Sequence, residues 1–184
     1  MKLETERLII RNWKISSRGD IMGAFAMYSD PQVLRYFPPT KQIASMSEMK
    51  EVLRQRIERN KTYPPGQGLW CVEERAESRV VGTALLKPLP DGAGNLTAEI
   101  EVGWHLRRDA WGKGFATEFG RALLEYGFAE LKLAEIFAVV FPSNQQSVRV
   151  TQRLGMEPLG PTDKYYGTTT ELFRMTADAW RQAI

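Results

Sequence analysis

The chain has one cysteine, one histidine and no long apolar run among its 184 residues. A single cysteine, Cys71, excludes an intrachain disulfide; we expect it in the core, and a reducing compartment suits it. The apolar runs, of which 136–141 is one, fall far short of the ~18 residues of a membrane span. The start carries acids, Glu4 and Glu6, where a secretory signal has an apolar segment. We therefore expect a cytoplasmic protein without a membrane segment.

Features of nucleic-acid-binding proteins are also missing. The net charge is only +3 and the sequence pI is about 9.0. The basic residues form no run with interleaved aromatics, so we expect no nucleic-acid partner. We expect no bound metal either. The small positive excess is sufficient for a polyanionic cofactor.

The composition is that of an ordinary globular protein, with 43% hydrophobic and 26% charged residues. A chain of this length buries about 70% of its unfolded surface. There is no internal repeat, low-complexity tract or linker, so we predict one mixed α/β domain over residues 1–184. The hydrophobic periodicity and the turn residues predict the following elements. Strands are expected at 3–13, 69–73, 80–86, 96–106, 134–141 and 171–175, and helices at 20–28, 45–60, directly after 114, at 144–155 and at 176–184.

A glycine corner stands at the start of the third predicted helix. Gly112 and Gly114 flank Lys113, and an amphipathic helical pattern follows at once. Glycines let backbone amides approach a ligand, and a helix N-terminus attracts anions. The corner is neither a dinucleotide fingerprint, which would have glycine where Thr117 stands, nor a P-loop, in which Ser or Thr would follow the lysine. A tight strand-to-helix turn without a ligand is the alternative.

Residues 111–118 (Trp-Gly-Lys-Gly-Phe-Ala-Thr-Glu) resemble the acetyl-CoA pyrophosphate loop of the GCN5-related N-acetyltransferases, in particular the ribosomal-protein N-terminal acetylase (RimJ/RimL-like) branch. Three more segments match in the right order: 4–11 with 29–31, 101–104, and 144–150 with 154–156. The resemblance covers nearly the whole chain. It implies a mostly antiparallel mixed sheet, splayed between the fourth and fifth strands and flanked by about four helices.

The resemblance also implies where acetyl-CoA binds. Loop amides would hold the pyrophosphate, and Lys113 and one of Arg107 and Arg108 would meet the outer phosphates. The pantetheine arm would pair with the backbone near a bulge at 102–106. The expected cofactor-binding residues are Val102, Trp104, Leu106, Trp111, Gly112, Lys113, Gly114, Phe115, Ala116, Thr117 and Asn144. Two alternatives stay open: the arginines form a solvated charged turn, and Asn144 is only a helix N-cap.

Two residues are expected to be catalytic. Glu101 holds the family's acidic position and would act as the base, through water. Ser147 would stabilise the departing thiolate, because Thr151 stands where many members have a tyrosine. The alternatives are a solvent-facing Glu101, a serine bonded to its own backbone, and His105, Glu99 or bulk water as the proton acceptor.

The resemblance implies an acetyl-CoA-dependent N-acetyltransferase that acts on a primary amine by direct aminolysis, with a protein N-terminal α-amine as the preferred acceptor. An α-amine with a pKa of 7.7–8.0 is roughly a tenth or more neutral at pH 7, whereas deprotonating a lysine there costs about 4.6 kcal/mol. The alternatives are a polyamine, amino acid or aminoglycoside acceptor, and a non-catalytic acyl-CoA-binding regulatory domain. The segments near 31–46 and 60–68, expected to face the acceptor, contain no motif that names it. A monomer or a homodimer is expected.

Overall fold

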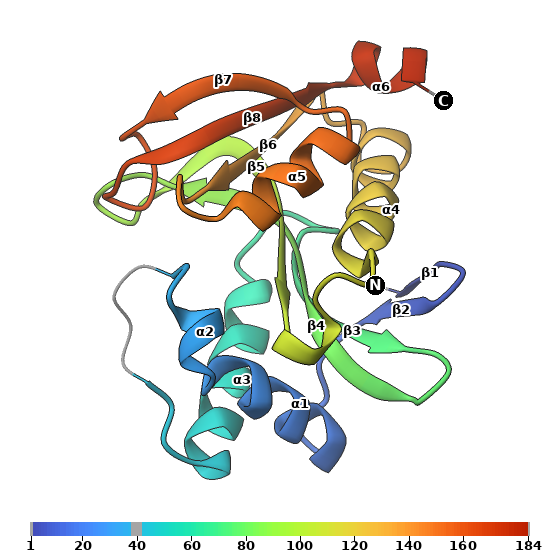
Figure 1. Ribbon diagram of the computed structural model, residues 1–184, viewed down its shortest axis with the longest axis vertical. Helices are drawn as coiled ribbons and strands as arrows, with labels where there is room; N and C mark the ends of the chain where they lie inside the picture. Colours follow the sequence, from blue (N-terminus) through green and yellow to red (C-terminus); the bar gives the residue numbers. More distant parts are fainter. Residues whose placement is uncertain (1, 38–41, 184) are drawn as a thin grey trace. The chain divides into compact units, whose positions relative to one another are not determined.

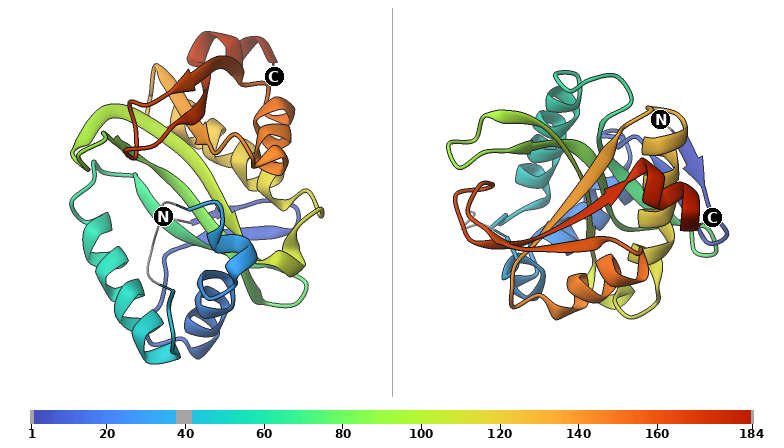
Figure 2. Two further views of the ribbon diagram at one scale, coloured as in Figure 1. Left: turned by 60° about the vertical axis from the view of Figure 1, so that its left-hand side comes forward. Right: turned by 90° about the horizontal axis from the view of Figure 1, so that it is seen from above.

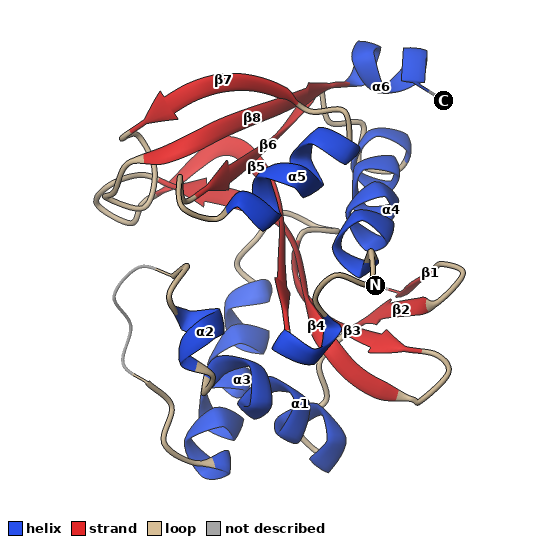
Figure 3. Cartoon of the chain, in the orientation of Figure 1, coloured by secondary structure: helices blue, strands red, loops and turns tan. Residues whose placement is uncertain are grey.

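The computed structural model describes residues 2–37 and 42–183, which form a mixture of helices and strands (Figure 3). The chain divides into two compact units, Met1–Leu85 with Trp104–Phe119 and Leu86–Gly103 with Gly120–Ile184. Each unit therefore consists of two separate stretches of sequence. Two long strands, β4 (Arg79–Pro90) and β5 (Leu96–Leu106), belong in part to each unit. The organisation of residues 1–184 as a single domain stays a prediction.

The first unit begins with a hairpin where the sequence predicted one continuous strand at 3–13. β1 (Lys2–Glu4) and β2 (Leu8–Arg11) pair in antiparallel register, with Leu3 opposite Ile10. β2 pairs in turn with β3 (Gly68–Glu74), and β4 and β5 follow in the sheet. Figure 1 shows β1, β2 and β3 side by side. The single predicted strand was therefore wrong, because the chain turns back between β1 and β2.

Three helices complete the first unit: α1 (Arg18–Tyr28), the four-residue α2 (Pro31–Leu34) and α3 (Met46–Asn60). The side chains of Ser17, Asp30 and Ser45 cap them by accepting a backbone N–H from the first turn. α1 packs against α2 and α3, and α3 also contacts β3 (Figure 2). Their apolar faces form one core together with residues of the preceding loop and of β3 and β4. It consists of Trp13, Ala24, Met27, Tyr28, Val33, Met49, Leu53, Cys71 and Val80. The prediction that Cys71 is a core residue is confirmed.

An ion pair ties β2 to α1. The Arg11 guanidinium donates two hydrogen bonds to Asp20, both 2.8 Å long, and the backbone N–H of Lys14 donates a third. Asp20 is only 1% exposed. Burial opposes its ionisation, but the bonds from Arg11 and Lys14 outweigh that effect and hold the pKa of Asp20 below its ordinary value. A carboxylate thus fixes the start of α1 against the sheet.

Gly23 lies where α1 meets β4 and leaves no room for a side chain. A Cβ on Gly23 would lie 2.4 Å from the Val80 Cβ. We therefore expect Gly23→Ala to lower the free energy of unfolding by about 1–3 kcal/mol, the usual cost of overpacking. Urea denaturation measures it.

Gly19→Ala in the same helix is the matched control. Its Cβ would meet Ser17 Oγ at 3.7 Å, an ordinary contact. We expect the free energy of unfolding to stay unchanged or to rise by up to about 1 kcal/mol, because alanine favours the helix. Equal stability of the two variants would show that α1 moves away from β4 at no cost.

In the second unit the sheet order is β4-β5-β6-β8-β7, with β6 (Glu135–Val140), β7 (Glu157–Thr162) and β8 (Thr170–Thr176). β6 pairs with β8 along its whole length in antiparallel register. β5 and β6 are parallel and pair at one position, Glu101 opposite Phe137. These are the fourth and fifth strands of the prediction, so the splay lies where it was expected. β7, next to β8 in Figure 1, was not predicted.

The second unit also holds α5 (Gln145–Arg153), α6 (Ala177–Ala183) and most of α4 (Phe115–Ala129). α5 contacts β6, and α6 contacts β8. The described residues contain six α-helices where about four were expected; one that was not predicted is the short α2, which begins at Pro31. The predicted mixed α/β fold is confirmed. No helix of the described residues is long and apolar enough to cross a membrane.

Candidate functional site

The predicted glycine corner exists in the first unit. Gly112 and Gly114 have φ angles of +75° and +80°, in the left-handed region that favours glycine. α4 begins at Phe115, and the N–H of Glu118 donates to the Gly114 carbonyl at 3.0 Å. This is the first hydrogen bond of the helix, so the backbone N–H groups of residues 115–117 have no carbonyl acceptor within it. The corner therefore presents N–H groups without a partner inside the helix, at the positive end of its dipole.

Two further features of the corner fit a bound anion. The hydroxyl of Thr117, in the first turn of α4, is buried and has no hydrogen-bond partner among the described residues. Buried hydroxyls normally have one, because an unpaired one costs free energy. A Cβ on Gly112 would have no atom within 4 Å, so glycine leaves open space there. The corner thus has donors, an approach for a ligand and the exposed Lys113, which together suit a pyrophosphate.

Trp111, which opens the loop, is turned toward the protein. Its indole N–H donates to the backbone carbonyl of Leu106 at 3.0 Å, and its ring packs against the core of the first unit. The side chain therefore holds the loop to the end of β5. Trp104 and Leu106, on the part of β5 that belongs to this unit, are both half-buried.

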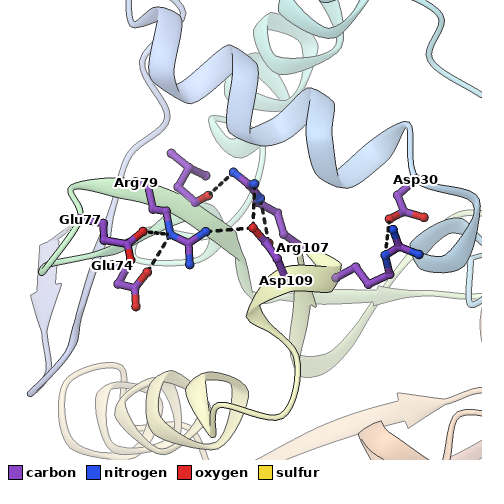
Figure 4. A network of polar contacts seen from close by, with 8 residues as sticks. Asp30, Glu74, Glu77, Arg79, Arg107 and Asp109 are labelled. Carbon is purple, nitrogen blue, oxygen red and sulfur yellow. Dashed lines mark hydrogen bonds and ion pairs between the residues drawn. The ribbon is translucent and has the colours of Figure 1, made fainter.

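Arg107 lies in a network of ion pairs with Arg79 and Asp109 (Figure 4), and Arg108 forms a separate ion pair. Arg107 and Arg79 both bond Asp109 at 2.9 Å, and Arg108 reaches Asp30 at 3.3 Å. Burial opposes ionisation of Asp109, but the two arginines outweigh it and lower the pKa of its carboxyl. This arrangement fits the alternative in which Arg107 and Arg108 form a charged turn. Lys113 is therefore the better candidate for a phosphate contact.

His105 also has structural partners in the first unit. Its Nδ1 lies 2.9 Å from the hydroxyl of Tyr28, and its ring centroid lies 4.5 Å from that of Phe37. The Tyr28 hydroxyl in turn contacts Thr83 at 2.8 Å. These contacts favour a structural role for His105.

In the second unit, Glu101 is part of a buried cluster that sequence reasoning missed. Glu101 is 5% exposed and forms an ion pair with Lys87 of β4, which is 8% exposed. The hydroxyl of Tyr166, in the loop between β7 and β8, donates to the same Glu101 oxygen. Lys87 Nζ also bonds the Tyr166 hydroxyl at 3.0 Å and the Pro88 carbonyl at 3.3 Å. Glu101 is thus neither solvent-facing nor an isolated carboxylate.

One signal in the sequence could have revealed Lys87. It directly follows the apolar stretch Ala84-Leu85-Leu86, at the end of the strand predicted at 80–86, and a lysine buried there needs an anionic partner. Nothing in the sequence indicates Tyr166, which comes from another part of the chain.

The start of α5 brings two predicted residues together in the second unit. The Asn144 side chain accepts the backbone N–H of Ser147 at 3.2 Å, so Asn144 is the N-cap of α5. Ser147 is half-buried in the first turn. Thr151 is fully buried and its hydroxyl donates to the Val148 carbonyl at 2.7 Å, which leaves Ser147 as the better hydroxyl for chemistry. Val102, also in this unit, is 1% exposed.

Comparison with known proteins identifies the family. The model of the acetyltransferase (GNAT) domain matches residues 7–157. The uncharacterized N-acetyltransferase YoaA of Bacillus subtilis (strain 168) is 29% identical over 164 residues, 89% of this chain and 86% of that protein.

Two solved structures show the same fold. A ribosomal-protein-S5-alanine acetyltransferase from Vibrio fischeri has a TM-score of 0.73 at 21% identity, covering 98% of both chains. RimL, a ribosomal L7/L12 alpha-N-protein acetyltransferase in complex with coenzyme A, has a TM-score of 0.76 at 12% identity, covering 97% of this chain and 99% of its own. The family model spans most of the sequence, and the fold and the glycine corner agree with it: this chain belongs to the GNAT family of acetyltransferases.

Proposed function

We propose that the protein transfers an acetyl group from acetyl-CoA to a primary amine, with a protein N-terminal α-amine as the preferred acceptor. The observation that carries the proposal is the corner at the start of α4. Amides, Lys113 and a Thr117 hydroxyl with no hydrogen-bond partner in the described part of the chain are available there to a pyrophosphate. Backbone groups of Val102, Trp104 and Leu106 would hold the pantetheine arm, and Asn144 would contact it. Acetyl-CoA supplies the activated thioester.

The reaction needs one proton removed and one charge stabilised. The amine nitrogen forms the new C–N bond as the C–S bond breaks; the amine loses a proton, and the sulfur leaves as a thiolate. The Ser147 hydroxyl, in the first turn of α5, is the group we assign to the thiolate. Glu101, on β5, is the carboxylate that we assign to the amine, acting through water.

The surroundings of Glu101 favour an acceptor that needs little help from a base. Lys87 and the hydroxyl of Tyr166 both contact the same oxygen of Glu101. The carboxylate is thus already engaged with two partners before any amine binds. An α-amine, partly neutral at pH 7, places a small demand on the base, whereas a lysine or polyamine places a large one. The ribosomal acetyltransferases with the same fold include one named for an α-N-protein activity, which supports the same acceptor.

A thiol-release assay with chosen acceptors tests the proposal. Peptides with a free N-terminus and no lysine should release coenzyme A from acetyl-CoA, whereas N-acetylated peptides containing lysine should not. Turnover only with polyamines, amino acids or aminoglycosides would make the small-amine alternative the correct one. Mass spectrometry of the product peptide then locates the acetyl group.

Ser147→Ala should lower kcat about tenfold and leave the Kd of acetyl-CoA unchanged. The lost hydroxyl acts on a charge that develops only as the thiolate departs, and a hydrogen bond to a charge contributes about 1.5 kcal/mol or more. Ser143→Ala, at an exposed serine just before the N-cap, is the control and should keep the wild-type kcat. An unchanged kcat in Ser147→Ala, with chemistry shown to limit the rate, would remove Ser147 from the mechanism.

A further inference from the structure

Arg7, in the turn between β1 and β2, contacts both parts of the glycine corner. Its Nη1 donates to the Lys113 carbonyl at 2.9 Å, and its Nε donates to Glu118 Oε2 at 2.7 Å. Its backbone N–H and the Thr5 hydroxyl both donate to the other oxygen of Glu118, at 2.8 and 2.6 Å. The turn therefore fixes the loop and the first turn of α4 at once.

The bond to the Lys113 carbonyl decides where the next amide points. The described chain has no cis peptide bond, so the Lys113 carbonyl and the Gly114 N–H point in opposite directions. Because Arg7 holds the carbonyl on its own side, the Gly114 N–H is directed away from Arg7. The left-handed φ of Gly114 accommodates this orientation.

The ion pair with Glu118 removes a charge that would oppose an anionic ligand. Glu118 lies in the first turn of α4, where its carboxylate would repel a pyrophosphate at the same helix end. Burial opposes its ionisation, but the bonds from Thr5 and Arg7 outweigh that effect and lower the pKa of Glu118. The carboxylate thus stays ionised, and Arg7 balances it.

We propose that Arg7 is a positioning residue for acetyl-CoA, which orients the Lys113–Gly114 peptide toward the pyrophosphate and neutralises Glu118. This inference rests on the proposed function. Arg7 acts through the loop and touches no reacting atom, so it governs affinity for the cofactor and leaves the rate of the chemical step unchanged.

A hollow beside Arg7 allows chemical rescue. It has a volume of about 670 Å³ and is lined by Glu6, Arg7, Glu74, Arg75, Ala76, Lys113 and Phe115. The Arg7 guanidinium lies over the Phe115 ring, 4.9 Å from its centroid, and its side chain is 46% exposed. Free guanidinium can therefore reach the space that a shortened side chain leaves.

Calorimetric titration with coenzyme A and acetyl-CoA, together with the melting temperature of the protein without cofactor, tests the proposal. In Arg7→Ala the Kd should rise at least about tenfold, as expected for the loss of two bonds that orient the loop. The kcat at saturating acetyl-CoA should stay within about twofold, and millimolar guanidinium should restore part of the affinity.

Arg75→Ala is the matched control. Arg75 lines the same hollow, but it bonds the Thr5 carbonyl and pairs with Glu4. The Kd of the Arg75→Ala variant for coenzyme A should equal that of the wild type.

The double variant Arg7→Met with Glu118→Gln removes both charges and keeps the protein testable if Arg7→Ala does not fold. Its Kd should stay raised because the Lys113 carbonyl is no longer held; full recovery of wild-type affinity would overturn the positioning role. A wild type that binds no coenzyme A refutes the proposed function itself. A wild type and an Arg7→Ala variant that bind it equally refute only this inference.

Discussion

Replacing Glu101 by glutamine is expected to lower the free energy of unfolding by about 3–5 kcal/mol, the usual cost of breaking a buried ion pair by removing one partner. Glu101 and Lys87 are both at least nine-tenths buried and paired with each other. The amide keeps the shape of the side chain but carries no charge, so Lys87 is left as an uncompensated buried cation. Urea denaturation of the wild type and the variant measures the loss.

Two further variants separate this effect from catalysis. Adding Lys87→Met to Glu101→Gln removes the stranded charge and should recover most of the lost stability. Glu51→Gln, the control, breaks an exposed ion pair with Arg54 on α3. It should lower the free energy of unfolding by less than about 0.5 kcal/mol. If Glu101→Gln has the wild-type free energy of unfolding and only a lower kcat, the Glu101 carboxylate acts as a base, and its charge does not stabilise the fold.

Gly112→Val is expected to weaken acetyl-CoA binding about a hundredfold. A Cβ at Gly112 would contact nothing within 4 Å, so the side chain clashes with no protein atom near its Cβ and obstructs only a ligand that approaches the loop. Losing two hydrogen bonds to a charged group, each of about 1.5 kcal/mol, corresponds to that factor. Isothermal titration calorimetry gives the change in Kd.

Gly94→Val is the matched control for Gly112→Val. Gly94, in the turn between β4 and β5, also has a left-handed φ, +88° against +75°, and a Cβ there would likewise contact nothing within 4 Å. Both variants therefore carry the same backbone strain, about 1–2 kcal/mol or more for a branched side chain. Only Gly112→Val should lose affinity. Equal Kd values in the two variants would mean that the loop is a turn without a cofactor.

The sequence predicted the elements whose signals are local. The glycine corner, the helix start at Ser45, the cap at Asn144 and the core position of Cys71 all follow from residues close together in the chain. β7 was missed because Pro158 and Pro161 argue against a strand. The sheet order ends at β7, and an edge strand tolerates proline.

Other features depend on contacts between distant residues, which no periodicity reveals. The turn after β1 is held by Glu118, more than a hundred positions away, so the predicted strand at 3–13 was too long. β4 runs on to Pro90, past the predicted end at 86. It has twelve residues against the seven of β3, so part of it has no β3 neighbour. The pairing of Glu101 with Lys87 and Tyr166 joins three separate segments in the same way.

Because Cys71 is buried, the rate at which its thiol is labelled can report how often the first unit opens. Burial raises the pKa of this thiol, so in the native state it is neither accessible nor ionised, and a disulfide reagent reacts with it only when β3 is exposed. The labelling rate in native buffer therefore reports transient exposure of the first unit. Glu101 and Lys87 belong to the second unit. Labelling Cys71 in Glu101→Gln would show whether loosening one unit also exposes the other, or whether the two open independently.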